Sequence, residues 1–222
     1  MQILKSVIGR KILMAITGQC MVLFAIVHVL GNSSIFMGPN GGLINAYAEH
    51  LHAFPPLVWV FRVVMLVLLC IHVFYGITLT LENSAATPAN YAVKRHLKAN
   101  FASENMIWTG LIMLAFIIFH ILHFTVKLSS LGVAEGTDAL GRADVGTMVI
   151  TAFHNAGYAA IYIVAMIALF LHVSHGFQSF FQTVGLNNDR TQCCFTGIGK
   201  LVAFIVAIGF ISIPALILCR FI

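Results

Sequence analysis

The chain has 222 residues, of which 60% are hydrophobic and 9% are charged, and its formal net charge is +5. A soluble domain carries about a quarter charged residues, so this composition excludes a soluble globular protein and indicates an integral membrane protein. The positive charge is no sign of a nucleic-acid partner, because the basic residues lie in short loops between apolar runs. We therefore expect membrane lipid, and no nucleic acid, around this chain.

Five apolar segments are long enough to cross a bilayer as helices, which takes about 20 residues each. In chain order they are 12–30, 57–81, 106–126, 147–177 and 197–219. The first could be mistaken for a signal peptide, but it runs on without a small-residue cleavage site, so we expect a retained helix. The sequence predicts an all-α membrane bundle of five transmembrane helices, with residues 1–222 as a single membrane domain.

A shorter segment, 43–53, lies between the first two predicted spans. It mixes apolar residues with Tyr47, Glu49, His50 and His52. This pattern is typical of an amphipathic helix that lies in the membrane interface.

Basic residues predict the orientation, because short cytoplasmic loops are enriched in lysine and arginine. Eight lie on the side of the N-terminus and of the second and fourth loops, namely Lys5, Arg10, Lys11, Lys94, Arg95, Lys98, Arg190 and Lys200. Four lie on the opposite side, namely Arg62, Lys127, Arg142 and Arg220. This asymmetry predicts a cytoplasmic N-terminus, with the segment 43–53 on the outer side.

Each of the first four apolar segments contains a histidine: His28, His72, His120 and His172. An ionisable side chain inside a membrane is costly and marks a functional site by default. A helix rises about 1.5 Å per residue, which puts His28 and His120 roughly 25 Å from the inner boundary and the other two about 15 Å from it. Neutral imidazole is a common axial ligand of haem iron. The paired depths predict two stacked b haems, one held by His28 and His120 and one by His72 and His172.

Bis-histidine ligation leaves haem iron without an open position, which suits electron transfer rather than oxygen binding. Zinc would instead need four convergent ligands at one depth. Gly76 and Gly176 each follow a predicted ligand by four residues and lie on the same helix face. They leave room for a flat macrocycle, although close helix contact explains a membrane glycine equally well.

Two further histidines compete for these roles. His123 follows His120 by three residues, and His175 follows His172 by three, so each pair lies near one face of its helix. His123 and His175 are alternative iron ligands, or neighbours of haem propionates or of a quinone. The estimated depth favours His120 over His123 as the partner of His28 only slightly.

The most specific stretches are His28-Val-Leu-Gly-Asn, His72-Val-Phe-Tyr-Gly and His172-Val-Ser-His-Gly. With these motifs on separate helices, nearly the whole chain resembles the dihaem cytochrome b membrane subunit of succinate:quinone and quinol:fumarate reductases, of the five-helix single-anchor type. Members of that family keep a glycine four residues after the fourth ligand, which favours His172 over His175. Two bulky residues follow their third ligand, which favours His120 over His123.

The resemblance implies a respiratory complex in the bacterial inner membrane. A flavoprotein subunit and an iron–sulfur subunit would dock on the cytoplasmic side and carry out the dicarboxylate chemistry. This chain would pass electrons between menaquinone and the iron–sulfur subunit, with the His28/His120 haem distal and the His72/His172 haem proximal. Relatives use a carboxylate between their first two helices at the quinone site, and Glu49 occupies the comparable place as the catalytic proton-transfer group. Direction of turnover and dimerisation of the complex stay open.

Two other functions also stay open. The membrane cytochrome b subunit of a hydrogenase or formate dehydrogenase likewise uses helical histidines, but its partner subunits are expected outside, whereas the basic loops point inside. A haem-free transporter or proton channel could use the histidines as relays. It would need a continuous polar path, for which the apolar segments offer few carboxylates.

Overall fold

The computed structural model describes residues 6–38, 42–86 and 99–222. Over these residues the chain is helical, with one isolated bridge between Thr137 and Ala143. Five helical segments are long and apolar enough to cross a membrane. They are α1 (Val7–Asn32, continued by the 3-10 turn η2, Ser33–Phe36), α3 (Pro55–Ala85), α5 (Met106–His120, continued by the π-helix η4, Ile121–Thr125), α7 (Ala156–Thr183) and α8 (Gln192–Leu218). The protein is therefore an all-helical, multi-pass membrane protein, as the composition predicted.

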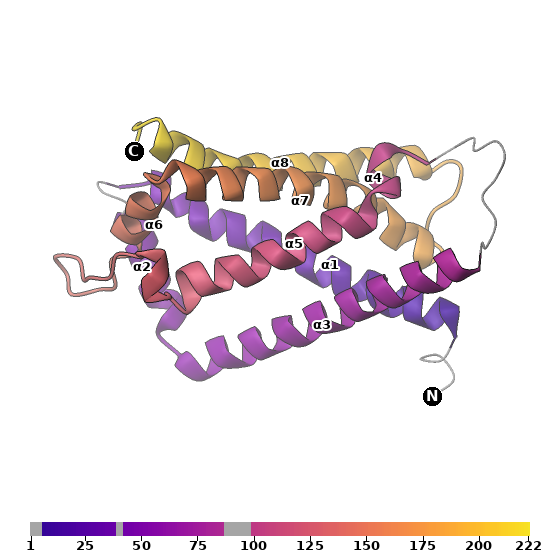
Figure 1. The fold of residues 1–222 in the computed structure, drawn as a ribbon, viewed down its shortest axis with the longest axis horizontal. Coiled ribbons are helices and arrows are strands. Elements are labelled where there is room, and N and C mark those ends of the chain that lie inside the picture. Colours follow the sequence, from indigo (N-terminus) through magenta and orange to yellow (C-terminus); the bar gives the residue numbers. More distant parts are fainter. Residues whose placement is uncertain (1–5, 39–41, 87–98) are drawn as a thin grey trace.

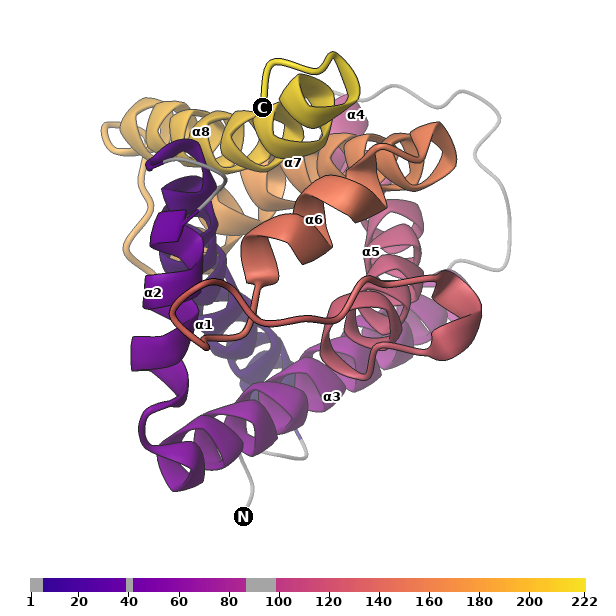
Figure 2. The ribbon, with the colours of Figure 1, turned by 90° about the vertical axis from the view of Figure 1, so that its left-hand side faces the viewer.

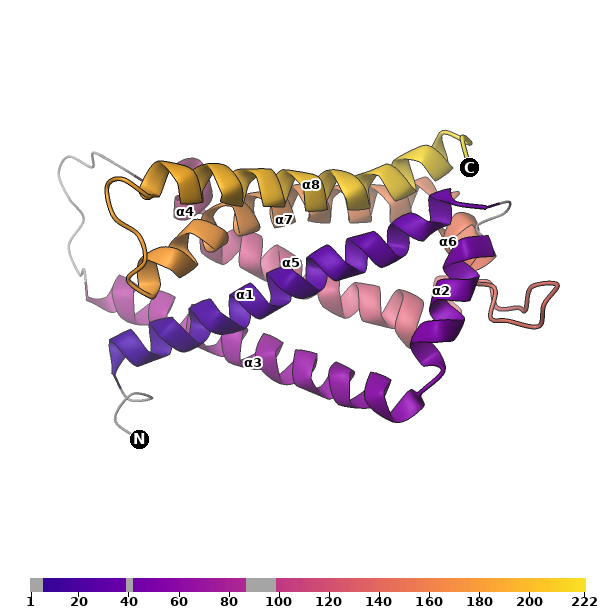
Figure 3. The same cartoon turned by 180° about the vertical axis from the view of Figure 1, so that it is seen from behind.

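The five long helices form a bundle with alternating directions. Figure 1 shows α1, α5 and α8 running one way and α3 and α7 the other. Seen from behind in Figure 3, α1 runs obliquely between α3 and the packed pair of α7 and α8. This alternation is what places helix positions that are far apart in sequence at the same depth in the bundle.

The end of the bundle where α1 begins, here called the N-terminal end, also carries the carboxyl end of α3, the short helix α4 (Phe101–Glu104) and the connection between α7 and α8. An ion pair joins two helices there, since Arg10 of α1 binds both carboxylate oxygens of Glu82 of α3 at 2.6 and 2.8 Å. Four of the eight residues behind the orientation prediction, Lys5, Lys94, Arg95 and Lys98, lie outside the described residues.

The opposite end of the bundle is covered by two short helices, α2 (Gly42–His52) and α6 (Val145–Phe153). Figure 2 looks onto this end, where α6 lies across the bundle and α2 runs along one side. The amphipathic helix predicted over 43–53 is thus confirmed as α2. Its residues Ile44 and Asn45 are buried, whereas Glu49, His50 and His52 are exposed.

The prediction of one helix over 147–177 is wrong. The chain forms α6, breaks at His154 and Asn155, and starts again as α7 at Ala156. The Asn155 side chain accepts hydrogen bonds from the backbone amides of Gly157 at 2.9 Å and Tyr158 at 3.3 Å. An asparagine in this position satisfies the free amides of a helix start, so it allows the apolar run to turn, and the span is Ala156–Thr183.

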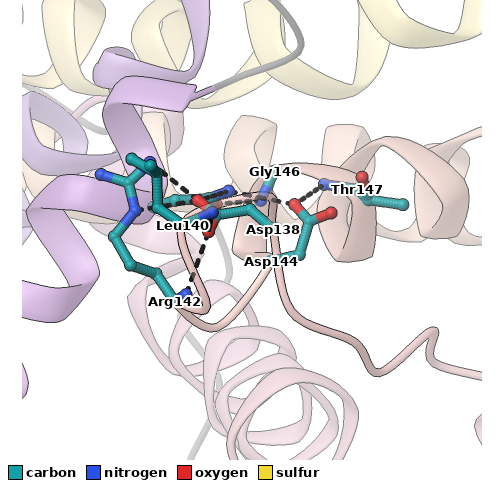
Figure 4. A network of polar contacts seen from close by, with 7 residues as sticks. Asp138, Leu140, Arg142, Asp144, Gly146 and Thr147 are labelled. Atoms are coloured by element: carbon teal, nitrogen blue, oxygen red, sulfur yellow. Dashed lines mark hydrogen bonds and ion pairs between the residues drawn. The ribbon is translucent and has the colours of Figure 1, made fainter.

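A polar network holds the loop before α6 against α2 (Figure 4). The buried Asn45 accepts a hydrogen bond from the Gly146 amide at 2.8 Å and donates to Asp144 at 3.1 Å and to Asp138 at 3.3 Å. Asp138 also pairs with Arg142, whose Nε lies 2.8 Å from it. Because Asn45 satisfies groups from both the loop and α6, it fixes α2 on the end of the bundle.

This network should open in acid. The hydrogen-bonded Arg142 guanidinium holds the pKa of Asp138 at about 2, below its ordinary value of 3.8. A carboxyl with a lowered pKa stabilises the folded state above its ordinary value, and this stabilisation is lost as pH falls towards the folded value. Between about pH 4 and about pH 2, hydrogen exchange in residues 132–146 should therefore accelerate. Asp138→Asn should reduce this transition to the part that depends on Asp144, whose pKa is also lowered by hydrogen bonds from Thr147 and Asn45. Asp189→Asn, at the N-terminal end, should retain the whole transition; an identical profile in all three proteins would contradict the role of Asp138.

Candidate functional site

The first pair of histidines is formed where α1 and α5 approach the end of the bundle covered by α2. The ring centres of His28 and His120 lie 5.9 Å apart, with their planes at 79°. Aromatic rings surround them: Phe24 and Phe210 lie 5.1 and 5.6 Å from His28, and Phe116 lies 5.8 Å from His120. The two histidines that were expected to meet from their depths are therefore neighbours in the fold.

The second pair joins α3 to α7. The ring centres of His72 and His172 lie 6.1 Å apart, with their planes at 71°. Nδ1 of His72 is 2.9 Å from the backbone carbonyl oxygen of Met14 on α1. A carbonyl can only accept a hydrogen bond, so Nδ1 carries the proton and Nε2 is left with a free lone pair.

His172 makes a comparable contact through Nδ1. Its Nδ1 lies 3.1 Å from the hydroxyl oxygen of Thr109. That hydroxyl donates its proton to backbone carbonyls of its own helix, at 3.0 Å to Asn105 and 3.2 Å to Met106. The direction of the contact between the Thr109 oxygen and Nδ1 depends on the tautomer of His172, and the tautomer with its proton on Nδ1 leaves Nε2 with a free lone pair. Histidines that bind metals characteristically donate their other ring N–H in this way.

The spacing of both pairs fits one metal shared by two imidazoles. A metal–imidazole bond is about 2 Å long and the ring centre lies about 1 Å behind the bonded nitrogen, so two rings on opposite sides of one metal have centres about 6 Å apart. The observed separations are 5.9 and 6.1 Å. Each pair therefore has a spacing at which both imidazoles could bind one metal, and packed aromatic rings without a metal also lie about 4.5–7 Å apart.

Glycines leave open space beside the second pair. A Cβ atom on Gly176 would meet no atom within 4 Å, and one on Gly76 would meet only the Met14 sulfur, at 3.9 Å. Both glycines lie one turn beyond a histidine of this pair, on the same helix face. No neighbouring side chain of the described residues therefore fills the space next to these two glycines.

Two further glycines support the same histidines from neighbouring helices. A Cβ on Gly18 of α1 would lie 2.8 Å from Cε1 of His72, and one on Gly110 of α5 would lie 3.2 Å from Cε1 of His172. A side chain at Gly18 would thus push the His72 ring from its place. Sequence reasoning missed both positions, because a glycine that serves a histidine on another helix has no fixed spacing from it.

The two alternative ligands, His123 and His175, are not the rings that face the opposite histidine of each pair. His123 is fully buried, with its ring 4.2 Å from that of Phe124 and 4.6 Å from that of Tyr158. Among the described residues, the ring that lies against His28 from this helix is that of His120. The π-helix η4 takes more residues per turn than an α-helix, so His123 lies further around the helix from His28 than His120 does, although both histidines contact Tyr162 of α7. Likewise, the ring next to His72 is that of His172 and not that of His175.

The predicted quinone residue Glu49 lies apart from both pairs, on the exposed surface of α2. Its helix is held close to the first pair, since the Tyr47 ring packs on Gly31, three residues after His28. A Cβ on Gly31 would lie 2.5 Å from the ring and hydroxyl of Tyr47. Glu49 is therefore positioned at the end of the bundle that is nearer to His28.

Within the described residues, no group of three or more histidine, cysteine, aspartate or glutamate side chains could hold a metal ion. A haem needs only two protein ligands, because the porphyrin supplies the others. Comparisons with family models, with curated proteins and with solved structures found no match to this chain. The family expected from the histidine motifs therefore stays a prediction, and the function must be argued from the site.

Proposed function

We propose that this chain is the membrane anchor and electron-transfer subunit of a succinate dehydrogenase or fumarate reductase complex in a bacterial inner membrane. It holds two haem b groups, one through His28 and His120 and the other through His72 and His172. The observation that carries this proposal is the occurrence of two histidine pairs with ring centres 5.9 and 6.1 Å apart. Bound there, the haems would supply one-electron transfer without an open position for oxygen.

The protein's own groups prepare the second site for this role. The Met14 carbonyl fixes the tautomer of His72, and the Thr109 hydroxyl lies 3.1 Å from Nδ1 of His172. Such hydrogen bonds orient a ligand ring and raise its basicity. Gly18 and Gly110 allow the two rings to be held close to their neighbouring helices.

The two ends of the bundle differ, and each suits a different partner: protein subunits at one end and menaquinone at the other. Arg10 and Lys11 lie near the start of α1, with Arg190 and Lys200 about the start of α8, at the N-terminal end. The iron–sulfur and flavoprotein subunits dock at this end in our proposal, on the cytoplasmic side. Menaquinone reacts at the opposite end, where α2 carries the exposed Glu49 at the end of the bundle nearer to His28, and Glu49 transfers the quinone's protons.

A proton relay or transporter fits the geometry less well. Among the described residues, the ion pairs lie at the two ends of the bundle, namely Arg10–Glu82, Lys127–Glu135 and Arg142–Asp138. Phenylalanine rings pack on the His28–His120 pair, and its polar neighbours are Asn32 beside His28 and Tyr162 beside His120, which do not extend to the His72–His172 pair in any contact among the described residues. A relay needs polar groups in succession, whereas paired imidazoles in an apolar setting suit a large apolar cofactor.

The test of the proposal is to find which electron donor reduces the haems of this chain. Native membranes that contain the chain should show reduction of b-type haem on addition of succinate and reoxidation by fumarate. Matched membranes from cells that lack the chain should not show this signal. Reduction by hydrogen or formate but not by succinate would instead assign the chain to a hydrogenase or formate dehydrogenase.

A further inference from the structure

One buried hydroxyl links His120 of the first pair to the neighbouring His123. Tyr162 on α7 is only 8% exposed. Its Oη lies 3.1 Å from Nδ1 of His120 and 3.1 Å from Nδ1 of His123. No backbone carbonyl is bonded to His120 Nδ1 in the described contacts, so Tyr162 takes the place that the Met14 carbonyl has at His72.

Counting protons on His120, Tyr162 and His123 determines which group donates each hydrogen bond. A tyrosine hydroxyl has one proton, so it donates to one imidazole and accepts from the other. If Nε2 of His120 binds iron, Nδ1 of His120 carries a proton and donates it to Tyr162. Tyr162 must then donate to Nδ1 of His123. His123 is left with a protonated Nε2, the buried nitrogen that has no partner within the described residues.

We propose that Tyr162 is a positioning residue that fixes the tautomer of His120 and sets the electron affinity of the haem it holds, an inference that rests on the proposed function. A hydroxyl that donates to His123 is polarised and becomes a better acceptor for the His120 N–H. An imidazole whose N–H is hydrogen-bonded is a more basic ligand. It favours the more positively charged, oxidised iron, and so lowers the midpoint potential of this haem.

The test is a redox titration of the purified full-length protein and of two matched variants. Tyr162→Phe removes the hydroxyl and keeps the ring. Tyr158→Phe makes the same change one turn earlier on α7, where the hydroxyl donates to the Leu131 carbonyl at 3.1 Å and the ring also contacts His123. The potential that persists in His72→Ala identifies the haem of the His28–His120 site.

We expect Tyr162→Phe to raise that potential and Tyr158→Phe to leave it unchanged. A tenfold change in the iron's preference between its two oxidation states corresponds to a shift of about 59 mV for a one-electron couple. His123→Leu, which removes the acceptor of the Tyr162 hydroxyl, should shift the same potential in the same direction by less. Loss of this haem in Tyr162→Phe alone would also support the role, because His120 would then lack its orienting partner.

Equal potentials in Tyr162→Phe and Tyr158→Phe would overturn the role of Tyr162, as would a shift of the other haem. These outcomes differ from a failure of the proposed function. A wild-type protein without haem would overturn both, whereas a wild-type protein with two haems that ignore Tyr162 would overturn only this inference.

Discussion

His28→Ala and His120→Ala should each remove the haem of the His28–His120 site and leave the potential of the second haem unchanged. His72→Ala and His172→Ala should each remove the haem of the His72–His172 site and leave the first haem in place. The reason is the pairing in the fold, since each haem would rest on one histidine from each of two helices, with ring centres about 6 Å apart. Losing one axial ligand takes away half of the protein's bonds to the iron. The measurement is a redox titration of each purified variant with its haem-to-protein ratio.

His123→Ala and His175→Ala are the matched controls for these four variants. Each lies three residues from a proposed ligand, but neither ring is the one that faces the opposite histidine. Both controls should keep two haems. If His123→Ala lost a haem that His120→Ala kept, the pairing would be assigned to the wrong residue, and the same holds for His175 against His172.

Glu49→Gln should abolish quinone-linked turnover of the assembled complex while both haems stay bound. The glutamine keeps the size of the side chain but cannot carry a proton to or from the quinone. A positioned acid or base contributes about 10²–10⁴-fold to a reaction rate, so the loss should be at least about a hundredfold. Activity is measured with a menaquinone analogue and, separately, with artificial dyes that bypass the quinone.

The matched control for Glu49 is Glu135→Gln. Glu135 lies in the loop before α6, is exposed, and pairs with Lys127 at 3.7 Å. It should retain turnover with quinone and with dyes. Quinone turnover in Glu49→Gln that equals that of Glu135→Gln would remove Glu49 from the site.

The sequence predicted the membrane architecture well, because each long helix must cover its backbone with an unbroken apolar surface. Regular helical rise then put His28 level with His120 and His72 level with His172, and these pairs are neighbours in the structure. These features depend on local composition and on one repeating geometry, both of which can be read along the chain.

Other features of the fold and of the site depend on contacts that have no recognisable pattern in the sequence. The break before α7 depends on a single Asn155 cap inside an otherwise apolar run. The π-helix that separates His123 from His120 is a local change of winding, and Gly18 meets His72 only through the packing of α1 on α3. The contacts of Tyr162 with His120 and His123 likewise could not be predicted, because they depend on the packing of α7 against α5 and η4.

The central claim is that two histidine pairs each hold a haem, and the most direct measurement is the haem content of the purified wild-type chain. A reduced-minus-oxidised spectrum with a haem-to-protein ratio should show two haem b groups per chain, with two separate midpoint potentials. A chain that carries its full complement of folded helices but no haem would contradict the account.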